Sequence, residues 1–142
     1  MSQLLFDTAA TSAFSIEQEK AGDIYAREAL LDSAMGAKRK RKSSEKLRRG
    51  RLAAEGLAFV ARDAFGGVIG TVRLWNVVTG NGAQALLLGP LAVAQGHAGG
   101  GIGTALMRHA ISEAGRLEHG VILLVGDAAY YERFGFSAEK TG

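Results

Sequence analysis

A glycine-dense segment in the second half of the chain has the residue types and spacing best suited to chemistry. Residues 89–106 read GPLAVAQGHAGGGIGTAL, with a cluster of four glycines: Gly99, Gly100, Gly101 and Gly103. Glycine adopts positive φ angles and leaves no side chain between the backbone and a ligand. A helical pattern begins at Thr104, so the N–H groups of a helix N-terminus would lie beside these glycines. Such groups favour phosphate, and the segment therefore predicts a loop that binds a pyrophosphate.

Two common phosphate-binding loops do not fit these glycines. The mononucleotide loop ends in Gly-Lys-Ser/Thr, and no lysine occurs here. The dinucleotide fingerprint Gly-x-Gly-x-x-Gly/Ala fails in both registers, because its last position falls on Thr104 or on Leu106. A flexible surface loop without a ligand is the alternative that the composition leaves open.

The elements that would position this loop are a strand before it and a helix after it. Residues 86–93 are almost all apolar, as in a strand that is buried on both faces. The helix is expected to run to about Glu118, where His119-Gly120 ends it. Residues 121–125 are a short apolar run, which predicts a parallel strand reached by a right-handed crossover.

An antiparallel meander of three strands is expected ahead of the loop. The first two strands, 57–62 and 68–77, are joined by a glycine-containing turn, and a Gly-Asn-Gly turn leads into a third strand that opens at Gln84. Pro90 cannot donate a hydrogen bond to a neighbouring strand. The dipeptide Gly89-Pro90 therefore predicts a bulge or a place where strand pairing ends.

The N-terminal third predicts one strand and one helix. Phe14 to Ile16 is a short apolar run. Asp23 is a candidate N-cap for a helix that continues to about Met35 and ends at Gly36. Three apolar residues of this helix would share one face: Ile24, Leu31 and Met35.

A strongly basic segment follows that helix. Residues 38–42 read KRKRK, three arginines up to Arg51 extend the charge, and Ser43 or Ser44 could cap a second helix. A functional interpretation is a surface for nucleic acid or for an acidic partner. No aromatic residue interleaves the charges, as a stacking platform for single strands requires. We therefore favour a solvated loop between two helices and do not expect nucleic-acid binding.

The composition is that of a globular protein, with 47% apolar and 22% charged residues. The length of 142 residues suits a single domain spanning 1–142. The absence of cysteine excludes disulfides, thiolate metal sites and a cysteine nucleophile, and three scattered histidines do not predict a metal site. No segment approaches the ~20 apolar residues of a membrane span. Residues 1–13 lack the pattern of a signal peptide.

Two motifs resemble the GNAT superfamily of acyl-CoA N-acyltransferases. The loop AGGGIG at 98–103, together with the Pro-Leu-Ala-Val strand before it, is similar to the family loop Gln/Arg-x-x-Gly-x-Gly/Ala, although Ala98 departs from its first position. Residues 130–136, YYERFGF, resemble the aromatic-Tyr-x-x-x-Gly-Phe signature of the same family. The order and the separation of the two motifs also agree. The chain looks most like a bacterial branch of predicted N-acetyltransferases.

This resemblance implies an α/β (α+β) fold with a mixed, mostly antiparallel central sheet, helices on both faces and a splayed strand pair that holds acyl-CoA. It implies acetyl-CoA as the acyl donor, an amine acceptor that the sequence does not identify, and no metal. The pyrophosphate would bind the loop N–H groups of Gly99, Gly100, Gly101, Ile102, Gly103 and Thr104. The pantetheine arm would pair with the backbone of Leu91, Ala92 and Val93, where one N–H would bind the thioester oxygen.

By the same resemblance, Tyr131 is the candidate acid that protonates the departing thiolate. A phenol with a pKa of about 10 can donate to a thiolate whose acid has a pKa of about 8.5. The alternative is that Tyr131 packs in the core through its ring. No general base is assigned, since residues 84–93 contain no carboxylate, His97 lies in the phosphate loop and Glu113 reads as a surface residue.

The favoured function is thus a cytoplasmic N-acetyltransferase that acetylates a primary amine. The alternatives are transfer of another acyl group, an acyl-CoA-binding module without turnover, and a basic nucleic-acid-binding protein. Members of the resembled branch usually continue with one more strand, whereas this chain stops at Gly142. It is naturally short, truncated, or completed by another chain, as in a homodimer.

Overall fold

One five-stranded sheet forms the centre of the structure, a computed structural model that describes residues 14–36, 53–97, 100–126 and 128–137. The strands follow one another across the sheet in chain order. Their bounds are β1 Phe14–Gln18, β2 Ala53–Asp63, β3 Val68–Val78, β4 Gln84–Val93 and β5 Ile122–Leu124. Strands β1 to β4 are antiparallel neighbours, and β5 runs parallel to β4. The predicted mixed, mostly antiparallel sheet is confirmed.

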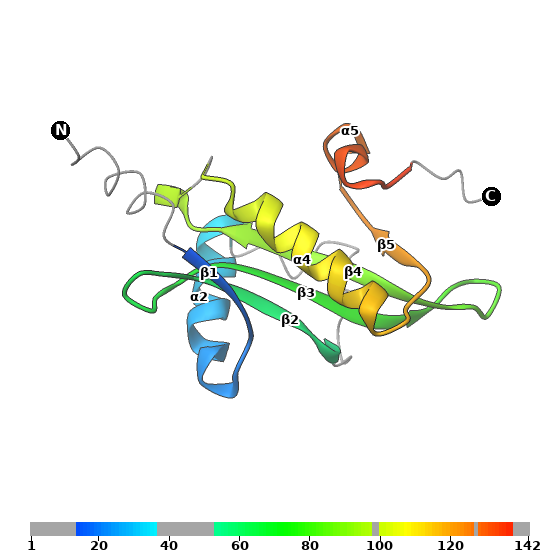
Figure 1. Cartoon of the computed structure of the whole chain (residues 1–142), viewed down its shortest axis with the longest axis horizontal. Coiled ribbons are helices and arrows are strands. Elements are labelled where there is room, and N and C mark those ends of the chain that lie inside the picture. The colour runs from blue at the N-terminus through cyan, green and yellow to red at the C-terminus, as the bar shows by residue number, and fades with distance from the viewer. Residues whose placement is uncertain (1–13, 37–52, 98–99, 127, 138–142) are drawn as a thin grey trace.

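Two long helices cover opposite faces of this sheet (Figure 1). Helix α2 (Ile24–Met35) packs on β3 and β4, and helix α4 (Ile102–Arg116) packs on β1 to β4 from the other side. The short helical segments are η1 Ala21–Asp23, η3 Gln95–His97, α5 Ala128–Tyr131 and η4 Glu132–Phe134. The α/β class with helices on both faces is therefore confirmed as well.

The main hydrophobic core lies between α4 and the sheet. Val72 and Leu74 of β3 are fully buried there, together with Leu106 of α4. Gly70 precedes them on the same face, where an added Cβ would lie 2.9 Å from Ile102 Cγ2 and 2.9 Å from Leu106 Cδ1. The absence of a side chain at Gly70 thus lets the first turns of α4 approach the sheet closely.

Helix α2 begins and ends where the sequence predicts, but its start is held differently. Asp23 stands at the N-cap position without capping the helix through its side chain. Its carboxylate instead accepts a hydrogen bond from the Lys20 N–H and forms an ion pair with Arg62 of β2. Gly36, with φ +79°, ends the helix. The residue predicted as a local cap therefore ties the helix to the sheet.

The predicted apolar face of α2 is only partly correct. Ile24 is 48% exposed, so its assignment to the buried face is wrong. Leu31 is buried, as expected, beside Leu30, and both pack against Ala92 of β4. The side chain of Met35 lies outside the described part of the structure. Among the side chains of α2 that the structure describes, the buried apolar ones are confined to about one turn.

The predicted end of the helix after the glycine loop is slightly too late. Helix α4 ends at Arg116 rather than Glu118, because Glu118 adopts φ +68° and the His119 N–H reaches back to the Ala114 carbonyl. This is the Schellman geometry with a non-glycine residue in the left-handed position. After η4, Gly135 (φ +98°) makes a turn.

Several expectations fall on residues that the structure does not describe. They are the expectations for the basic run 38–42 and for the second helix at Ser43 or Ser44.

Candidate functional site

A β-bulge interrupts the pairing of β3 with β4 where the sequence predicts it. Val72 pairs with Leu91 and Leu74 pairs with Leu88, so two residues of β4, Gly89 and Pro90, lie opposite the single residue Arg73. Along a strand, successive N–H groups point alternately to one edge and to the other, and one extra residue shifts this alternation by one position. The bulge therefore decides which N–H groups of β4 face each neighbour.

Beyond the bulge, the outer edge of β4 has no strand partner among the described residues. Strand β5 pairs only with Leu86 to Leu88. Before the bulge, the Leu86 N–H points outward to the Val121 carbonyl at 2.9 Å; after it, the Ala94 N–H points inward to the Ile69 carbonyl of β3 at 2.8 Å. Because successive N–H groups alternate between edges, those of Leu91 and Val93 point to the open edge.

The three predicted pantetheine-binding residues therefore differ in orientation. Leu91 and Val93 offer backbone groups to the open edge, whereas Ala92 turns its N–H toward β3. The Ala92 side chain is buried against α2. Two of these three residues are thus placed to pair with an extended ligand.

The indole of Trp75 fixes the bulge. Trp75 Nε1 donates to the Gly89 carbonyl at 2.6 Å, and the residue is buried. A buried indole N–H normally finds an acceptor, since leaving it unpaired is costly. Sequence reasoning missed this contact, because Trp75 and Gly89 lie on different strands and the alternation of β3 shows only which face Trp75 occupies.

The glycine loop ends at the N-terminus of α4, as predicted. Gly101 is the N-cap with φ +84°, and no side chain caps the helix. The first helical bond runs from the Ala105 N–H to the Gly101 carbonyl at 3.0 Å. The N–H groups of Ile102, Gly103 and Thr104 precede it, in the first turn, where α-helices leave donors unpaired. Gly99 lies outside the described residues.

The helix N-terminus lies next to the open edge of β4. A Cβ placed on Gly103 would lie 3.7 Å from Val93 Cγ2, so the first turn of α4 contacts the last residue of the strand. The open edge of β4, which can pair with an extended chain, therefore continues into the N-terminus of α4, with its N–H donors and its partial positive charge.

The two adjacent tyrosines of α5 occupy different environments. Tyr130 is 37% exposed, and its hydroxyl lies 4.0 Å from the Cβ position of Gly103. Tyr131 is half-buried and packs against the main core, with its ring edge so close to Gly126 that an added Cβ would lie 2.5 Å from Tyr131 Cε2. The rings meet edge to face, with centroids 4.9 Å apart.

Arg133 joins this segment to the helix N-terminus. Its Nη2 donates to Thr104 Oγ1 at 3.0 Å, and its guanidinium lies 5.0 Å from the centre of the Tyr130 ring. Sequence reasoning did not single out this arginine, although its place inside the YYERFGF motif was a signal. The structure thus brings both sequence motifs to one end of α4.

The side chains considered as bases lie at the surface of the molecule. Glu113 forms an ion pair with Arg116 at 2.9 Å on the surface of α4, and this hydrogen bond lowers the pKa of the carboxyl. His97 is exposed on η3. The described residues contain no group of three or more His, Cys, Asp or Glu side chains that could hold a metal ion.

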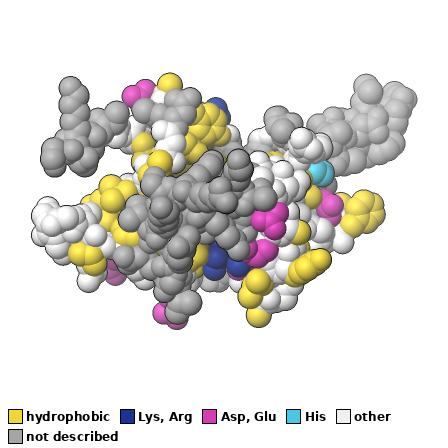
Figure 2. All heavy atoms as spheres, turned by 180° about the vertical axis from the view of Figure 1, so that it is seen from behind, with side chains coloured by type: hydrophobic (Ala, Val, Ile, Leu, Met, Phe, Trp, Pro, Cys, Tyr) yellow, Lys and Arg dark blue, Asp and Glu magenta, His cyan; other side chains and the backbone are white. Residues whose placement is uncertain are grey.

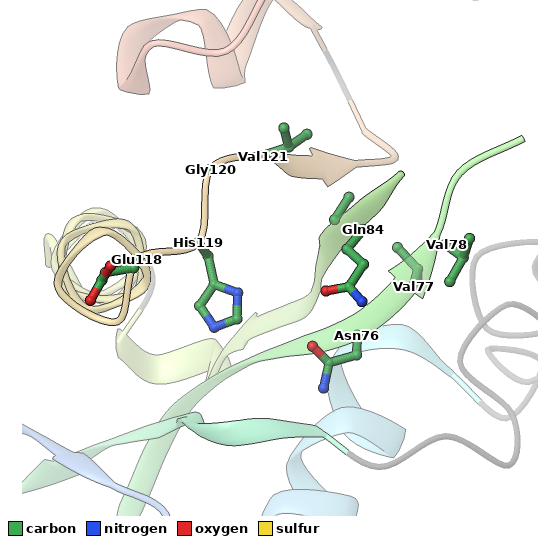
Figure 3. A pocket seen from close by; sticks show the side chains of 9 residues that line it. Asn76, Val77, Val78, Gln84, Glu118, His119, Gly120 and Val121 are labelled. Carbon is green, nitrogen blue, oxygen red and sulfur yellow. The ribbon is translucent and has the colours of Figure 1, made fainter. Parts of the chain in front are cut away.

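A separate cavity of about 570 Å³ lies at the other end of β4. It forms where the β3–β4 hairpin meets the turn between α4 and β5, and His119, Asn76 and Gln84 point into it (Figure 3). The full lining is Asn76, Val77, Val78, Gln84, Ala85, Glu118, His119, Gly120 and Val121. None of the predicted site residues lines this cavity.

Comparison with known proteins agrees with the arrangement at the start of α4. Residues 54–138 match the family model described as an acetyltransferase (GNAT) domain. No curated protein sequence matches the chain significantly. In the described part of the chain, no helix is both long enough and apolar enough to span a membrane.

Solved structures with the same fold include two close in sequence. The GNAT family N-acetyltransferase YhbS from Escherichia coli, solved in complex with CoA, is 30% identical with a TM-score of 0.74; the match covers 88% of this chain and 69% of that one. A GNAT family acetyltransferase from Brucella melitensis, solved with acetyl-CoA, is 28% identical with a TM-score of 0.72, covering 89% and 84%. The family model and these two structures lead to one conclusion: the chain belongs to the GNAT family of acetyltransferases.

Proposed function

We propose that this chain is an N-acetyltransferase that transfers the acetyl group of acetyl-CoA to a primary amine in the cytoplasm, with residues 1–142 acting as a single domain. The observation that carries the proposal is the open edge of β4 beyond the bulge, which leads into the uncapped N-terminus of α4. Its relatives from Escherichia coli and Brucella melitensis were solved with CoA and acetyl-CoA, which supports the choice of donor.

The cofactor would lie along this edge in an extended form. The pyrophosphate binds the N–H groups of the segment from Gly99 to Thr104, and the pantetheine arm pairs with the backbone at Leu91 and Val93 as an added strand would. The Leu91 N–H is the first outward donor after Pro90, which has none. It therefore donates to the thioester oxygen and stabilises the oxyanion of the tetrahedral intermediate.

The chemical step needs one proton donor and one proton acceptor. The amine nitrogen attacks the thioester carbon, the C–S bond breaks, and the Tyr131 hydroxyl gives its proton to the departing thiolate. The proton that the amine loses passes to water. The Tyr131 ring also packs against Gly126 and the core, as the alternative structural role of this residue predicts, so the variants described below must separate the two roles.

A pair of variants at Gly101 tests the phosphate site. Gly101→Asp and Gly101→Asn have nearly the same shape, and both must tolerate the left-handed φ of +84°. Only the aspartate adds a negative charge beside the expected pyrophosphate. Isothermal titration with acetyl-CoA should show far weaker binding for Gly101→Asp than for Gly101→Asn. Equal affinities would exclude the loop as the phosphate site.

A second pair of variants tests the acid. Tyr131→Phe should keep acetyl-CoA affinity and lower turnover by roughly 10- to 1000-fold, the range for loss of one general acid. Tyr130→Phe should lower turnover much less. Thiol release is measured with an amine panel of polyamines, amino acids, aminoglycosides and lysine peptides. A larger loss in Tyr130→Phe would assign the acid to that hydroxyl, which lies beside Gly103.

A further inference from the structure

Three buried polar side-chain atoms of the described residues have no hydrogen-bond partner. They are Glu19 Oε1, Thr71 Oγ1 and Arg73 Nε. Thr71 and Arg73 alternate along β3 with Val72 and Leu74, which face α4, so both point to the face that α2 covers. Buried polar groups are nearly always paired, and such exceptions call for an explanation.

Arg73 differs from the other two arginines near this face. Arg27 pairs with Glu19 and Glu28, and Arg62 pairs with Glu17 and Asp23. Within the described segments, the Arg73 side chain forms no ion pair, and its Nε has no hydrogen-bond partner. Its guanidinium lies over the Trp75 ring, 4.6 Å from the ring centre. Arg73 is thus a half-buried cation with unused donors.

Arg73 stays ionised although its surroundings lower its pKa. Burial lowers the pKa of Arg73 and the nearby Arg27 charge lowers it further, while Glu19 and Glu28 oppose both effects. Arginine remains charged in proteins because its pKa starts so high. Both glutamates accept hydrogen bonds from Arg27, and the Arg73 Nε–H is left without an acceptor. Figure 2 views this side of the molecule, where basic and acidic side chains meet.

The position of Arg73 relates it to the proposed reaction. Arg73 is the one β3 residue opposite the bulge at Gly89-Pro90. The Arg73 guanidinium lies over the ring of Trp75, and the Trp75 indole donates a hydrogen bond to the Gly89 carbonyl. Strand β4 lies beside β3 at the usual strand spacing of about 4.8 Å, and the Leu91 N–H is on its far edge. An amine that reaches the thioester from the α2 side would therefore have its neighbouring groups close to Arg73.

We propose that Arg73 binds the carboxylate of an acceptor that carries this group next to its amine, as a free α-amino acid does. This inference rests on the proposed acetyl transfer and adds the class of acceptor. A planar guanidinium matches a carboxylate in a bidentate pair, which gives direction as well as charge. Such a pair also satisfies donors that the protein itself leaves unpaired.

The experiment compares matched acceptors on the full chain. Thiol release is measured at saturating acetyl-CoA with glycine, phenylalanine and glutamate, each against its α-amide, and with spermidine and a lysine peptide. The wild type should favour the acids over the amides by at least about tenfold in kcat/KM, the value of one charge-assisted hydrogen bond. The amides have the less basic amines, so amine reactivity alone would favour them instead.

Three variants separate recognition from folding. Arg73→Gln should raise KM for the acids and bring the acid-to-amide ratio close to one, and Arg73→Lys should retain part of the preference. Acetyl-CoA affinity and Tm should stay near the wild-type values in both. Arg116→Gln, which removes an exposed guanidinium from α4, should change none of these quantities.

Each outcome decides between the two proposals. The role of Arg73 is wrong if the wild type releases thiol equally well with acids and amides. It is also wrong if Arg73→Gln lowers the activity on acids and amides equally. The proposed acetyl transfer stands in both cases. The role of Arg73 is likewise wrong if thiol is released with spermidine or the lysine peptide but with none of the amino acids. The absence of release with every amine contradicts the proposed acetyl transfer itself.

Discussion

The two faces of the sheet are built from different kinds of contact. Under α4, Leu106, Met107 and Ala110 are fully buried against apolar strand residues. Under α2, the apolar contact is limited to Leu30 and Leu31, and the rest of the interface carries arginines and carboxylates. Apolar burial is the dominant source of stability. The α4 face therefore stabilises the fold, while the α2 face holds polar groups suited to selecting a ligand.

The largest expected effect is the loss of a core side chain on the α4 face. Leu106→Ala should destabilise the protein by about 2–5 kcal/mol, since it removes buried methyl groups and leaves a cavity. Leu31→Ala on the α2 face is the matched variant and should cost less, because its apolar cluster is small. Urea unfolding followed by circular dichroism measures both. An equal or greater cost at Leu31 would contradict the division between the faces.

Neighbouring positions on β3 should respond in opposite directions. Gly70→Ala should cost about 1–3 kcal/mol through overpacking against Ile102 and Leu106. Thr71→Val should be neutral or stabilising by up to about 1 kcal/mol, because it replaces a buried hydroxyl that has no partner. The same unfolding assay compares them. Destabilisation of both by similar amounts would show that the two faces are equally packed.

The ion pairs on the α2 side should make stability depend on acid pH. The hydrogen bond from Arg62 lowers the pKa of Asp23, aided by the Lys20 N–H, and Arg62 likewise lowers the pKa of Glu17. A carboxyl whose folded pKa lies below its unfolded value stabilises the fold above the unfolded value of about 4. This contribution is lost as the pH falls through the folded pKa.

Asp23→Asn isolates this effect. The variant should lose about 1–2 kcal/mol near neutral pH, since a charge-assisted pair is replaced by a neutral one. Its stability should then fall less steeply than that of the wild type between about pH 5 and pH 2. Thermal unfolding across this range gives the two slopes. Parallel curves would mean that Asp23 does not titrate differently in the folded and unfolded states.

A small destabilisation is expected at the bulge, together with an effect on ligand binding. Trp75→Phe keeps an aromatic ring but loses the hydrogen bond to the Gly89 carbonyl, at a cost of about 1 kcal/mol. Because the bulge sets the orientation of the Leu91 N–H, acetyl-CoA affinity should also fall. Titration and unfolding of the same sample test both. Unchanged affinity would show that the bulge keeps its shape without the indole.

Local sequence patterns predicted most of the site-bearing half of the chain. Four glycines before a helical pattern indicated the loop and the start of α4, and Pro90 indicated the bulge. These features depend on the positive φ angles that glycine allows and on the backbone N–H that proline lacks, which are properties of single residues. The pattern was less informative for α2, where Ile24 was expected inside and is exposed. A helix that contacts the sheet over about one turn has little periodicity to detect.

The sequence by itself determined where the chain turns, where it forms strands and helices, and which segment can leave backbone groups open to a ligand. Only the tertiary structure decided the partners of the charged side chains. Asp23 reads as a helix cap but pairs with Arg62, 39 residues away. Arg73 reads as an ordinary strand residue, but its buried Nε has no hydrogen-bond partner among the described residues. Hydrogen bonds and ion pairs act over a few ångströms. Their partners therefore follow from how distant segments meet, and no local pattern contains that information.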